Sequence, residues 1–393
     1  MRYDANMKKQ QQPHTIPLTL LGGLSAEQFL AEYWQKKPLL IRQAIPGFNG
    51  LLSPNELAGL SCEEEVQARL VLFQGEQWHV ENGPFEEERF ASLPERDWTL
   101  LVQGVNHYLP EAEELLQQFS FVPYARLDDL MVSFAPDEGG VGPHFDSYDV
   151  FLLQAEGKRL WRISEQDDLS LVEGAPLRIL QNFNTEQEWV LEPGDMLYLP
   201  PHVAHWGIAV GNAMTYSIGF RAPAAQELGS VFLDYLQDKL NLSGMYTDPD
   251  LQYQPHPAEI GSGMLDKVGT MLDKIRWQRE DIAVFLGRYL SEPKLHILFD
   301  ENEDISLKQF TQQLARHGIV LSGKSQMLFH GRQFFMNGEQ WTAGEQHQDI
   351  LIALADDRQL NATCFDATVL QDTVLLHKLR EWYLAGYLYL MDE

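Results

Sequence analysis

Residues 191–210, LEPGDMLYLPPHVAHWGIAV, contain two short apolar runs separated by sharp turns. Pro193-Gly194-Asp195 predicts a tight turn before the strand MLYL, and Pro200-Pro201 ends that strand because proline cannot donate to a sheet ladder. The run HWGIAV then begins the next strand. Similar short runs continue over residues 129–220, in LMVSFA, YDVFLLQAE, RLWRIS, LRIL, EWVLE and MTYSIGF. About eight short strands with such turns predict an antiparallel barrel or jelly roll.

The sequence on either side of this region has a different pattern. Residues 24–35 show helical spacing behind a Ser25 cap, and apolar residues recur at helical spacing over 224–292. From about residue 300, a helix, an Asn337-Gly338 hairpin signal and two further helices are compatible with a winged helix. The sequence therefore predicts a polar tail at 1–20, a mainly β catalytic domain of double-stranded β-helix (jelly-roll or cupin) type at 21–222, a helical region at 223–299 and an α+β winged-helix-like domain at 300–393.

The net charge of −28 limits the classes of partner. Acidic residues are spread over the whole chain, so the protein repels phosphate backbones and attracts basic partners, although solubility alone also explains the charge. We therefore expect no direct nucleic-acid binding. No run approaches the roughly 18 apolar residues of a membrane helix, and the N-terminus has no signal-peptide pattern. Cys62 and Cys364 form no metal-type pair. These features predict a cytoplasmic protein without a membrane segment.

The segment GPHFDSYDVF at 142–151 places a histidine and an aspartate two residues apart. On a strand, His144 and Asp146 would point to the same face, either as a surface pair or as two ligands of a metal. A third ligand is expected from LEPGDMLYLPPHVAHWG, where His202 lies in the turn and His205 opens a strand. Two histidines and one carboxylate form the facial triad preferred by non-haem Fe(II), which leaves positions open for a co-substrate and dioxygen.

Four segments together resemble the bacterial ribosomal-oxygenase branch of the JmjC family, also called the cupin-4 family: GPHFDSYDVF, GKRLWRI, LEPGDMLYLPPHVAHWG and NAMTYSIGFRAP. The resemblance covers nearly the whole chain after residue 20. It implies a protein hydroxylase that depends on Fe(II), 2-oxoglutarate and O₂, a helical dimerisation region that forms a homodimer, and a C-terminal winged helix. It also implies that His144, Asp146 and His205 are the iron ligands.

The distal carboxylate of 2-oxoglutarate needs a buried cation, and GKRLWRI offers Lys158, Arg159 and Arg162. Arginine suits this task because its planar fork binds a carboxylate with two parallel hydrogen bonds. Strand alternation places Arg159 on one face and the other two cations on the opposite face. The resemblance assigns the cosubstrate to Arg159, and the alternative is an exposed hairpin arginine. Ser133 and Thr215 could add hydroxyls, although well-known relatives have asparagine at position 215.

The resemblance implies a basic substrate, namely an arginine of large-subunit ribosomal protein sixteen that is hydroxylated at its β-carbon. Tyr148 and Asp149 are expected to border the substrate opening, and packing is the alternative for Tyr148. Asp137 and Asp149 are candidate partners of a substrate guanidinium, and a solvated surface charge is the alternative for each. An acidic enzyme suits such a basic partner, but the sequence does not distinguish arginine from histidine. The same residues are also compatible with a metal-dependent cupin enzyme that acts on a small molecule without 2-oxoglutarate, and with a demethylase or inactive chromatin-type reader.

Overall fold

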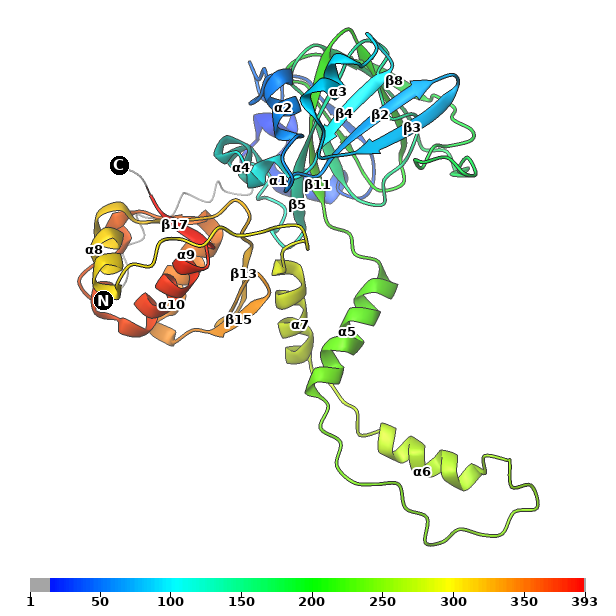
Figure 1. Cartoon of the computed structure of the whole chain (residues 1–393), viewed down its shortest axis with the longest axis vertical. Coiled ribbons are helices and arrows are strands. Elements are labelled where there is room, and N and C mark those ends of the chain that lie inside the picture. The colour runs from blue at the N-terminus through cyan, green and yellow to red at the C-terminus, as the bar shows by residue number, and fades with distance from the viewer. Residues whose placement is uncertain (1–14, 392–393) are drawn as a thin grey trace. The chain divides into compact units, whose positions relative to one another are not determined.

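The computed structural model describes residues 15–391, which form two compact units (Figure 1). Of the described residues, 15–222, 293–326 and 347–391 belong to unit 1, and 223–292 and 327–346 belong to unit 2. Most of the polar tail predicted at 1–20 lies outside the described residues, but its last residue, Leu20, is buried in unit 1. No helix of the described part is long and apolar enough to cross a membrane.

The larger sheet of unit 1 has the strand order β1-β9-β6-β11-β5-β4-β2-β3. Every neighbouring pair is antiparallel, and Figure 1 shows β4, β2 and β3 at one end of the sheet. In chain order, the strands are β1 (Leu39–Ile41), β2 (Ala68–Gln74), β3 (Gln77–Asn82), β4 (Trp98–Val102), β5 (Leu127–Ala135), β6 (Val150–Gln154), β9 (Met196–Leu199) and β11 (Ala213–Phe220).

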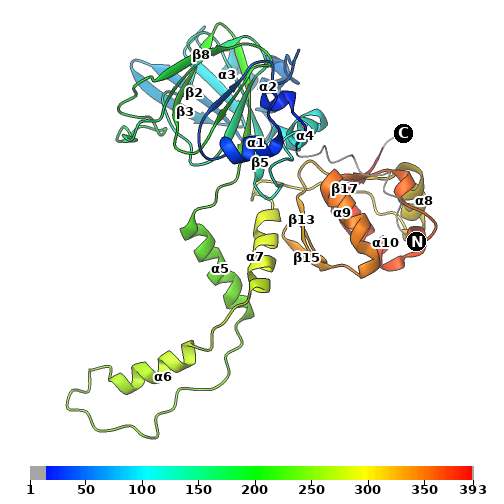
Figure 2. The same cartoon turned by 180° about the vertical axis from the view of Figure 1, so that it is seen from behind.

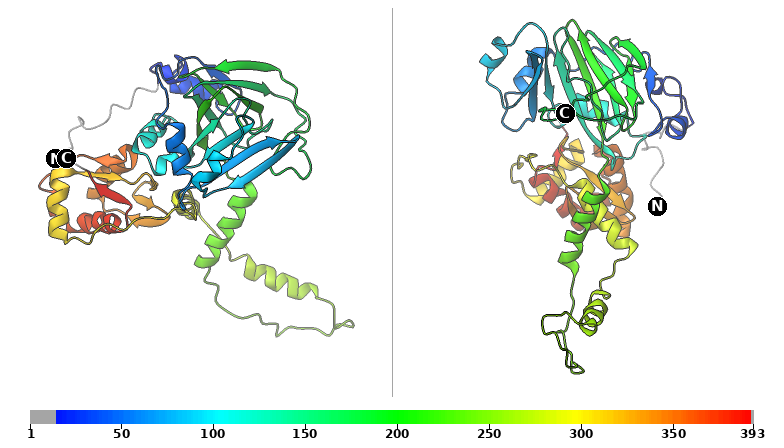
Figure 3. Two further views of the ribbon diagram at one scale, coloured as in Figure 1. Left: turned by 45° about the horizontal axis from the view of Figure 1, so that its top comes forward. Right: turned by 90° about the vertical axis from the view of Figure 1, so that its right-hand side faces the viewer.

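A second, antiparallel sheet in the order β10-β7-β8 completes the sandwich, which Figure 3 shows from two further directions. Along β11, Met214 and Tyr216 enter the main apolar core, so alternation turns Thr215 to the opposite face of the larger sheet. The predicted jelly-roll type of fold is therefore confirmed. The strands of this sheet are β7 (Lys158–Ser164), β8 (Gln187–Leu191) and β10 (Ala204–Val210).

One predicted strand is wrong. LRIL, residues 177–180, forms no strand and contributes a single bridge between Leu171 and Leu180. Its last two residues, Ile179 and Leu180, are buried for another reason, because Leu180 packs against Phe145 in a separate small cluster. A short apolar run therefore indicated burial correctly but not the type of structure.

Helices near the N-terminus pack on the outer face of the larger sheet. Ser25 caps α1, as the sequence predicted, and the structure adds a capping box with Gln28. Phe29 of α1 then lies with its ring centroid 5.0 Å from that of Tyr198 on β9. This packing leaves the other face of the sheet free for a site. The helices are α1 (Ala26–Glu32), α2 (Pro54–Leu60), α3 (Glu87–Ala91) and α4 (Pro110–Gln117).

The C-terminal part of unit 1 combines three helices with a small antiparallel sheet in the order β16-β12-β17. Arg358, buried and in the left-handed region (φ 58°), ends α9 and forms an ion pair of 2.6 Å with Glu113 of α4. The elements are α8 (Leu307–His317), β12 (Ile319–Leu321), α9 (Gln348–Asp357), β16 (Gln359–Leu360), α10 (Thr373–Leu384) and β17 (Leu388–Leu390).

Unit 2 consists of three helices and a three-stranded meander. Helices α5 and α7 lie side by side (Figure 2), and the predicted Asn337-Gly338 turn has positive φ at both residues. The elements are α5 (Ala225–Lys239), α6 (Ser262–Leu272), α7 (Arg279–Ser291), β13 (Met327–His330), β14 (Gln333–Met336) and β15 (Glu339–Thr342).

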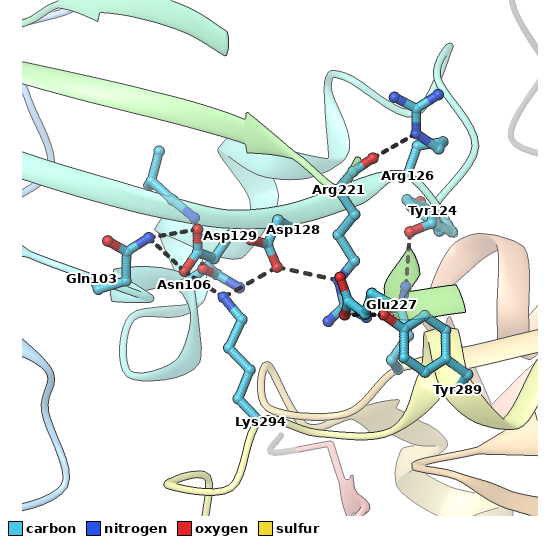
Figure 4. A network of polar contacts seen from close by, with 12 residues as sticks. Gln103, Asn106, Tyr124, Arg126, Asp128, Asp129, Arg221, Glu227, Tyr289 and Lys294 are labelled. Atoms are coloured by element: carbon cyan, nitrogen blue, oxygen red, sulfur yellow. Dashed lines mark hydrogen bonds and ion pairs between the residues drawn. The ribbon is translucent and has the colours of Figure 1, made fainter. Parts of the chain in front are cut away.

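Within unit 1, Lys294 binds two consecutive carboxylates at the start of β5 (Figure 4). Its Nζ lies 3.1 Å from Asp128 Oδ1 and 3.2 Å from Asp129 Oδ2. Gln103 also donates to both oxygens of Asp129, which is buried. Burial and the neighbouring Asp128 raise the pKa of Asp129, and Lys294 opposes this effect. The lysine therefore compensates a carboxylate that the β-sheet buries.

His107 is partly buried near the same lysine. A Cβ on Gly104 would lie 2.7 Å from its Nδ1, so only glycine fits there. Burial lowers the pKa of His107 to about 4, and the positive charge of Lys294 adds to this effect. The folded chain therefore keeps this ring neutral.

We expect the chain to lose stability as the pH falls from about 6.5 towards about 4. In this range His107 is protonated in the unfolded chain but stays neutral in the folded chain, and this difference favours unfolding. Above this range the ring is neutral in both states. His107→Gln should therefore reduce the stability difference between pH 7 and pH 5 by about 2 kcal/mol, measured by urea denaturation. The exposed His79 on β3 provides the control variant His79→Gln, and an equal reduction in both variants would contradict the assignment.

Candidate active site

The segment that follows β5 runs antiparallel to the free edge of β10. Glu138 N donates to Ala209 O (3.0 Å), and Ala209 N donates to Gly139 O (2.9 Å). Further along, His144 and His205 exchange both backbone hydrogen bonds, of 2.9 and 2.7 Å. A directly opposed, hydrogen-bonded pair holds its two Cα atoms about 5.5 Å apart. Two histidines that lie far apart in the sequence are thus placed as neighbours.

Glycines allow the segment to approach β10 so closely. A Cβ on Gly140 would lie 2.5 Å from the carbonyl oxygen of Gly207, and one on Gly139 would lie 2.1 Å from that of Trp98. Neither backbone oxygen can move without breaking the sheet. The EGGVG sequence before His144 is therefore required for the approach of the backbone to its neighbours.

The structure brings the side chains of His144, Asp146 and His205 together. One ligand atom from each residue can be chosen so that all three lie within 4.8 Å of one another. His205 Nε2 lies 3.6 Å from Asp146 Oδ2, and the two imidazole centroids are 4.2 Å apart. Two imidazole nitrogens and a carboxylate converging from one side fit a divalent metal with a facial set of ligands.

Backbone carbonyls orient both imidazole rings. His144 Nδ1 lies 3.0 Å from Gly142 O, and His205 Nδ1 lies 2.9 Å from Val203 O. Since a carbonyl oxygen only accepts, each Nδ1 must carry the proton, which leaves Nε2 free to bind a metal. Burial and the neighbouring His144 lower the pKa of His205 to about 4, so this ring is a neutral ligand at ordinary pH.

The first histidine of the PPHVAH segment, His202, does not join this group. It is exposed and adopts φ +67° in the turn after β9, where its backbone N–H donates to Asp146 O (2.7 Å). The ring therefore lies outside the cluster, in agreement with its predicted place in the turn. Its backbone contact still helps to fix Asp146.

Arg159 lies on β7, on the same face as Trp161 and opposite to Lys158 and Arg162, as alternation predicted. Its side chain is buried, and Nε and Nη2 have no hydrogen-bond partner among the described residues. Burial lowers its pKa to about 10, so the guanidinium remains charged at neutral pH. A buried cation with free donors is costly unless an anion meets it. The residues present therefore fit a carboxylate ligand at this position.

Ser133 and Thr215 also lie inside the sandwich, but their hydroxyl protons are engaged. Thr215 Oγ1 donates to Gln154 Oε1 (3.0 Å), and Gln154 is oriented by its own bond from Nε2 to Glu156 O (2.9 Å). Ser133 Oγ lies 3.4 Å from Thr215 O. A carboxylate only accepts hydrogen bonds, so Thr215 is poorly suited to hold one. No sequence pattern indicated that Gln154 binds Thr215, because the two residues lie 61 positions apart.

The expected substrate residues lie in different environments. Tyr148 is exposed (42%), and partial burial of its hydroxyl and the neighbouring Asp146 raise its pKa. Asp137 is exposed, lies 3.6 Å from Arg96 and accepts a hydrogen bond from Gly211 N. Both remain predictions as substrate residues.

The expectation for Asp149 is wrong. Its side chain is fully buried, where it accepts hydrogen bonds from Tyr198 Oη (2.6 Å) and Gln35 Nε2 (2.9 Å). Arg126 also lies 3.5 Å from this carboxylate. Asp149 therefore stabilises the junction between the N-terminal helices and the larger sheet, and no substrate can reach it.

Comparisons with known proteins agree with this arrangement. Residues 114–228 match a family model described as the JmjC domain, and residues 274–389 match one described as a ROXA-like winged helix. The chain is 37% identical over 369 residues to the ribosomal protein uL16 3-hydroxylase of Escherichia coli, covering 93% of this chain and 97% of that protein. It is 39% identical over 242 residues to a probable ribosomal oxygenase of Haemophilus influenzae, covering 60% and 57% of the two chains.

Solved structures show the same relationship. The X-ray structure of E. coli ycfD matches with a TM-score of 0.84 and 36% identity, over 92% of this chain and 97% of that one. The structure of YcfD, a ribosomal oxygenase from E. coli, in complex with cobalt and 2-oxoglutarate matches with a TM-score of 0.81 and 36% identity, over 93% and 98%. These findings confirm the predicted resemblance and the fold class, including the winged-helix part.

We expect His205→Ala to weaken Mn²⁺ binding by more than about 100-fold, because loss of a ligand costs more than loss of its hydrogen-bonded neighbour. His202→Ala changes the same residue type three positions away and should leave the affinity unchanged. Isothermal titration calorimetry of the full chain measures both. Equal losses of Mn²⁺ affinity in the two variants would contradict the assignment of His205 as a metal ligand.

Proposed function

This chain belongs to the JmjC-domain ribosomal oxygenases, and on that basis we propose that it hydroxylates a side chain of a basic ribosomal protein. Its activity is that of a 2-oxoglutarate-dependent dioxygenase with Fe(II). The observation that carries the proposal is the combination, in one sandwich, of three converging ligand atoms and a buried arginine whose Nε and Nη2 meet no hydrogen-bond partner within residues 15–391. We propose His144, Asp146 and His205 as the iron ligands and Arg159 as the partner of the distal carboxylate of 2-oxoglutarate.

Iron and 2-oxoglutarate, when bound, supply the activation of dioxygen that hydroxylation of an unactivated carbon requires. The residues of the chain would bind these two groups, orient them and shield them from water. Two neutral imidazoles and one carboxylate present their ligand atoms from one side, so the opposite side stays open to other ligands. Trp161 packs between Arg159 and His205 on the inner face and reduces access of water to both.

The proposed substrate is an arginine of ribosomal protein uL16, hydroxylated at its β-carbon. The support is the name of the E. coli relative and the charge of −28, which favours a basic partner. Tyr148, exposed next to Asp146, and Asp137, an exposed carboxylate just before the glycine loop, are the proposed contacts of the substrate side chain. A histidine target is the alternative. We propose the cytoplasm, where ribosomal proteins are made, as the place of action.

The test is turnover of 2-oxoglutarate to succinate with Fe(II), in the absence and presence of uL16 peptides that carry either arginine or histidine. We expect stimulation by an arginine peptide and a mass gain of one oxygen atom on that peptide. Stimulation by the histidine peptide alone would transfer the proposal to histidine. Turnover of neither peptide would contradict both forms.

Arg159→Gln should raise the KM for 2-oxoglutarate by about 100-fold, because it removes a bidentate, charge-assisted pair. Arg162→Gln is the matched control on the same strand, since Arg162 points to the other face and pairs with the exposed Glu188. Thr215→Val should change the KM little, because the Thr215 hydroxyl is committed to Gln154. An unchanged KM in Arg159→Gln would contradict the assignment of Arg159 as the partner of the distal carboxylate of 2-oxoglutarate.

We also propose that unit 2 pairs two chains into a homodimer. Helix α6 has no buried residue, yet Met264, Leu265 and Leu272 share one side of it and are 46%, 61% and 55% exposed. Leu233 on α5 (65%) and Trp277 (52%) are exposed as well. An amphipathic helix whose apolar side meets no partner in its own chain needs one from another chain.

Leu265→Asp should therefore shift the chain from dimer to monomer, because it places a charge in an apolar interface. Sedimentation velocity measures the change. The neighbouring exposed charge Asp266 offers the control Asp266→Asn, which should remain dimeric. A parent chain that sediments as a monomer would contradict the dimer without affecting the proposed chemistry.

A further inference from the structure

We propose that the segment between β7 and β8, residues 165–186, is a clamp that sets the metal affinity of the site. It acts on the loop from Gly142 to Phe145, and its positioning residues are Ile179, Leu180 and Arg178. The inference rests on the proposed metal centre and concerns residues that do not touch the metal. Nothing in the sequence pattern marked this segment except the apolar run LRIL.

The clamp holds the loop through its backbone. Leu180 N donates to Pro143 O over 2.8 Å, directly before the ligand His144. The Leu180 side chain packs with Phe145 and Ala204, both of which lie next to a ligand in the sequence. One residue of the segment therefore contacts the neighbours of both histidine ligands, His144 and His205.

Gly142 is enclosed from two sides. A Cβ at this position (φ +75°) would lie 2.8 Å from Ile179 Cδ1 and 2.8 Å from Trp78 Cζ2 of β3. Because Ile179 and Trp78 leave no free space, they fix the peptide plane of Gly142. The carbonyl oxygen of Gly142 is the acceptor that orients His144. Movement of Ile179 would thus change the direction of His144 Nε2.

Phe145 anchors the loop on its opposite face. It lies between the proposed ligands His144 and Asp146 in the sequence, and its ring packs in an apolar cluster with Leu180 and Ala204, where it is 8% exposed. The guanidinium of Arg178 covers the ring, with Cζ 4.6 Å from its centroid. A shift of Phe145 would displace both adjacent ligands.

Contacts within residues 165–186 hold this segment in a fixed conformation. Leu171 and Leu180 form a β-bridge, and Val172 N donates to Ile179 O (2.8 Å). At its base, Asn182 Nδ2 donates to Asp168 Oδ2 (3.0 Å). These contacts close the segment on itself, so it meets the ligand loop as a preformed surface.

The experiment measures Co²⁺ binding by the full chain, using calorimetry and the visible absorption of the bound ion. Ile179→Ala and Phe145→Leu should each raise the Co²⁺ dissociation constant by about 10-fold, the lower end of the effect of groups that orient ligands. Each should also alter the Co²⁺ spectrum, because the ligand geometry changes. Val172→Ala, an exposed position on the same segment, is the control and should match the parent chain.

The thermal midpoint in the presence of a chelator is recorded for every variant, so that loss of folding is separated from loss of affinity. Should Ile179→Ala fail to fold, Ile179→Val provides the smaller truncation, with an expected rise of about threefold. Folded variants with the parent's dissociation constant and spectrum would overturn the clamp and leave the metal centre intact. A parent chain that binds no Co²⁺ would instead overturn the metal centre and the clamp together.

Discussion

The site depends on two backbone hydrogen bonds, those that His144 and His205 exchange across the edge of β10. Side chains at the ends of long loops would have to be ordered separately, at a cost in conformational entropy for each residue. Here the same sheet pairing that forms the fold also places both imidazoles. Asp146 joins them from the loop that follows, with Oδ2 3.6 Å from His205 Nε2. The two histidines proposed as metal ligands are therefore positioned by backbone pairing, and the glycines before His144 permit this pairing.

The two faces of the larger sheet carry different kinds of side chain, apolar on the outer face and partly polar on the inner face. Its outer face carries Phe151, Tyr198 and Tyr216 into an apolar core with the N-terminal helices. Its inner face carries the polar Thr215 and Gln154 towards the space that contains Arg159. The apolar core stabilises the fold and leaves the inner face free to hold groups that cost stability. A buried guanidinium without a partner is such a group, and it is acceptable only beside a well-packed core.

The features of the site that depend on residues close together in the sequence could be predicted, and those that depend on contacts between distant segments could not. The inward face of Arg159 follows from alternation along β7, and the structure has it as expected. His144 and Asp146 come together as expected, but the predicted strand is wrong, because they lie in a loop with a single bridge at His144. Asp149 was misjudged because proximity in sequence to the ligands was taken for proximity in space, whereas its side chain enters the apolar core. The bond from Thr215 to Gln154 and the contacts of Ile179 join distant segments. Only the assembled fold shows them.

The charges inside the sandwich explain why the metal and 2-oxoglutarate belong together. Asp146 is the one carboxylate among the three proposed ligands, and its negative charge balances the positive charge of the buried Arg159. A divalent cation alone would leave two uncompensated positive charges in a poorly solvated interior, which is unfavourable. A dicarboxylate dianion alone would leave two negative ones. Bound together they bring the interior to neutrality, so each raises the affinity of the site for the other, and by linkage the two effects are equal.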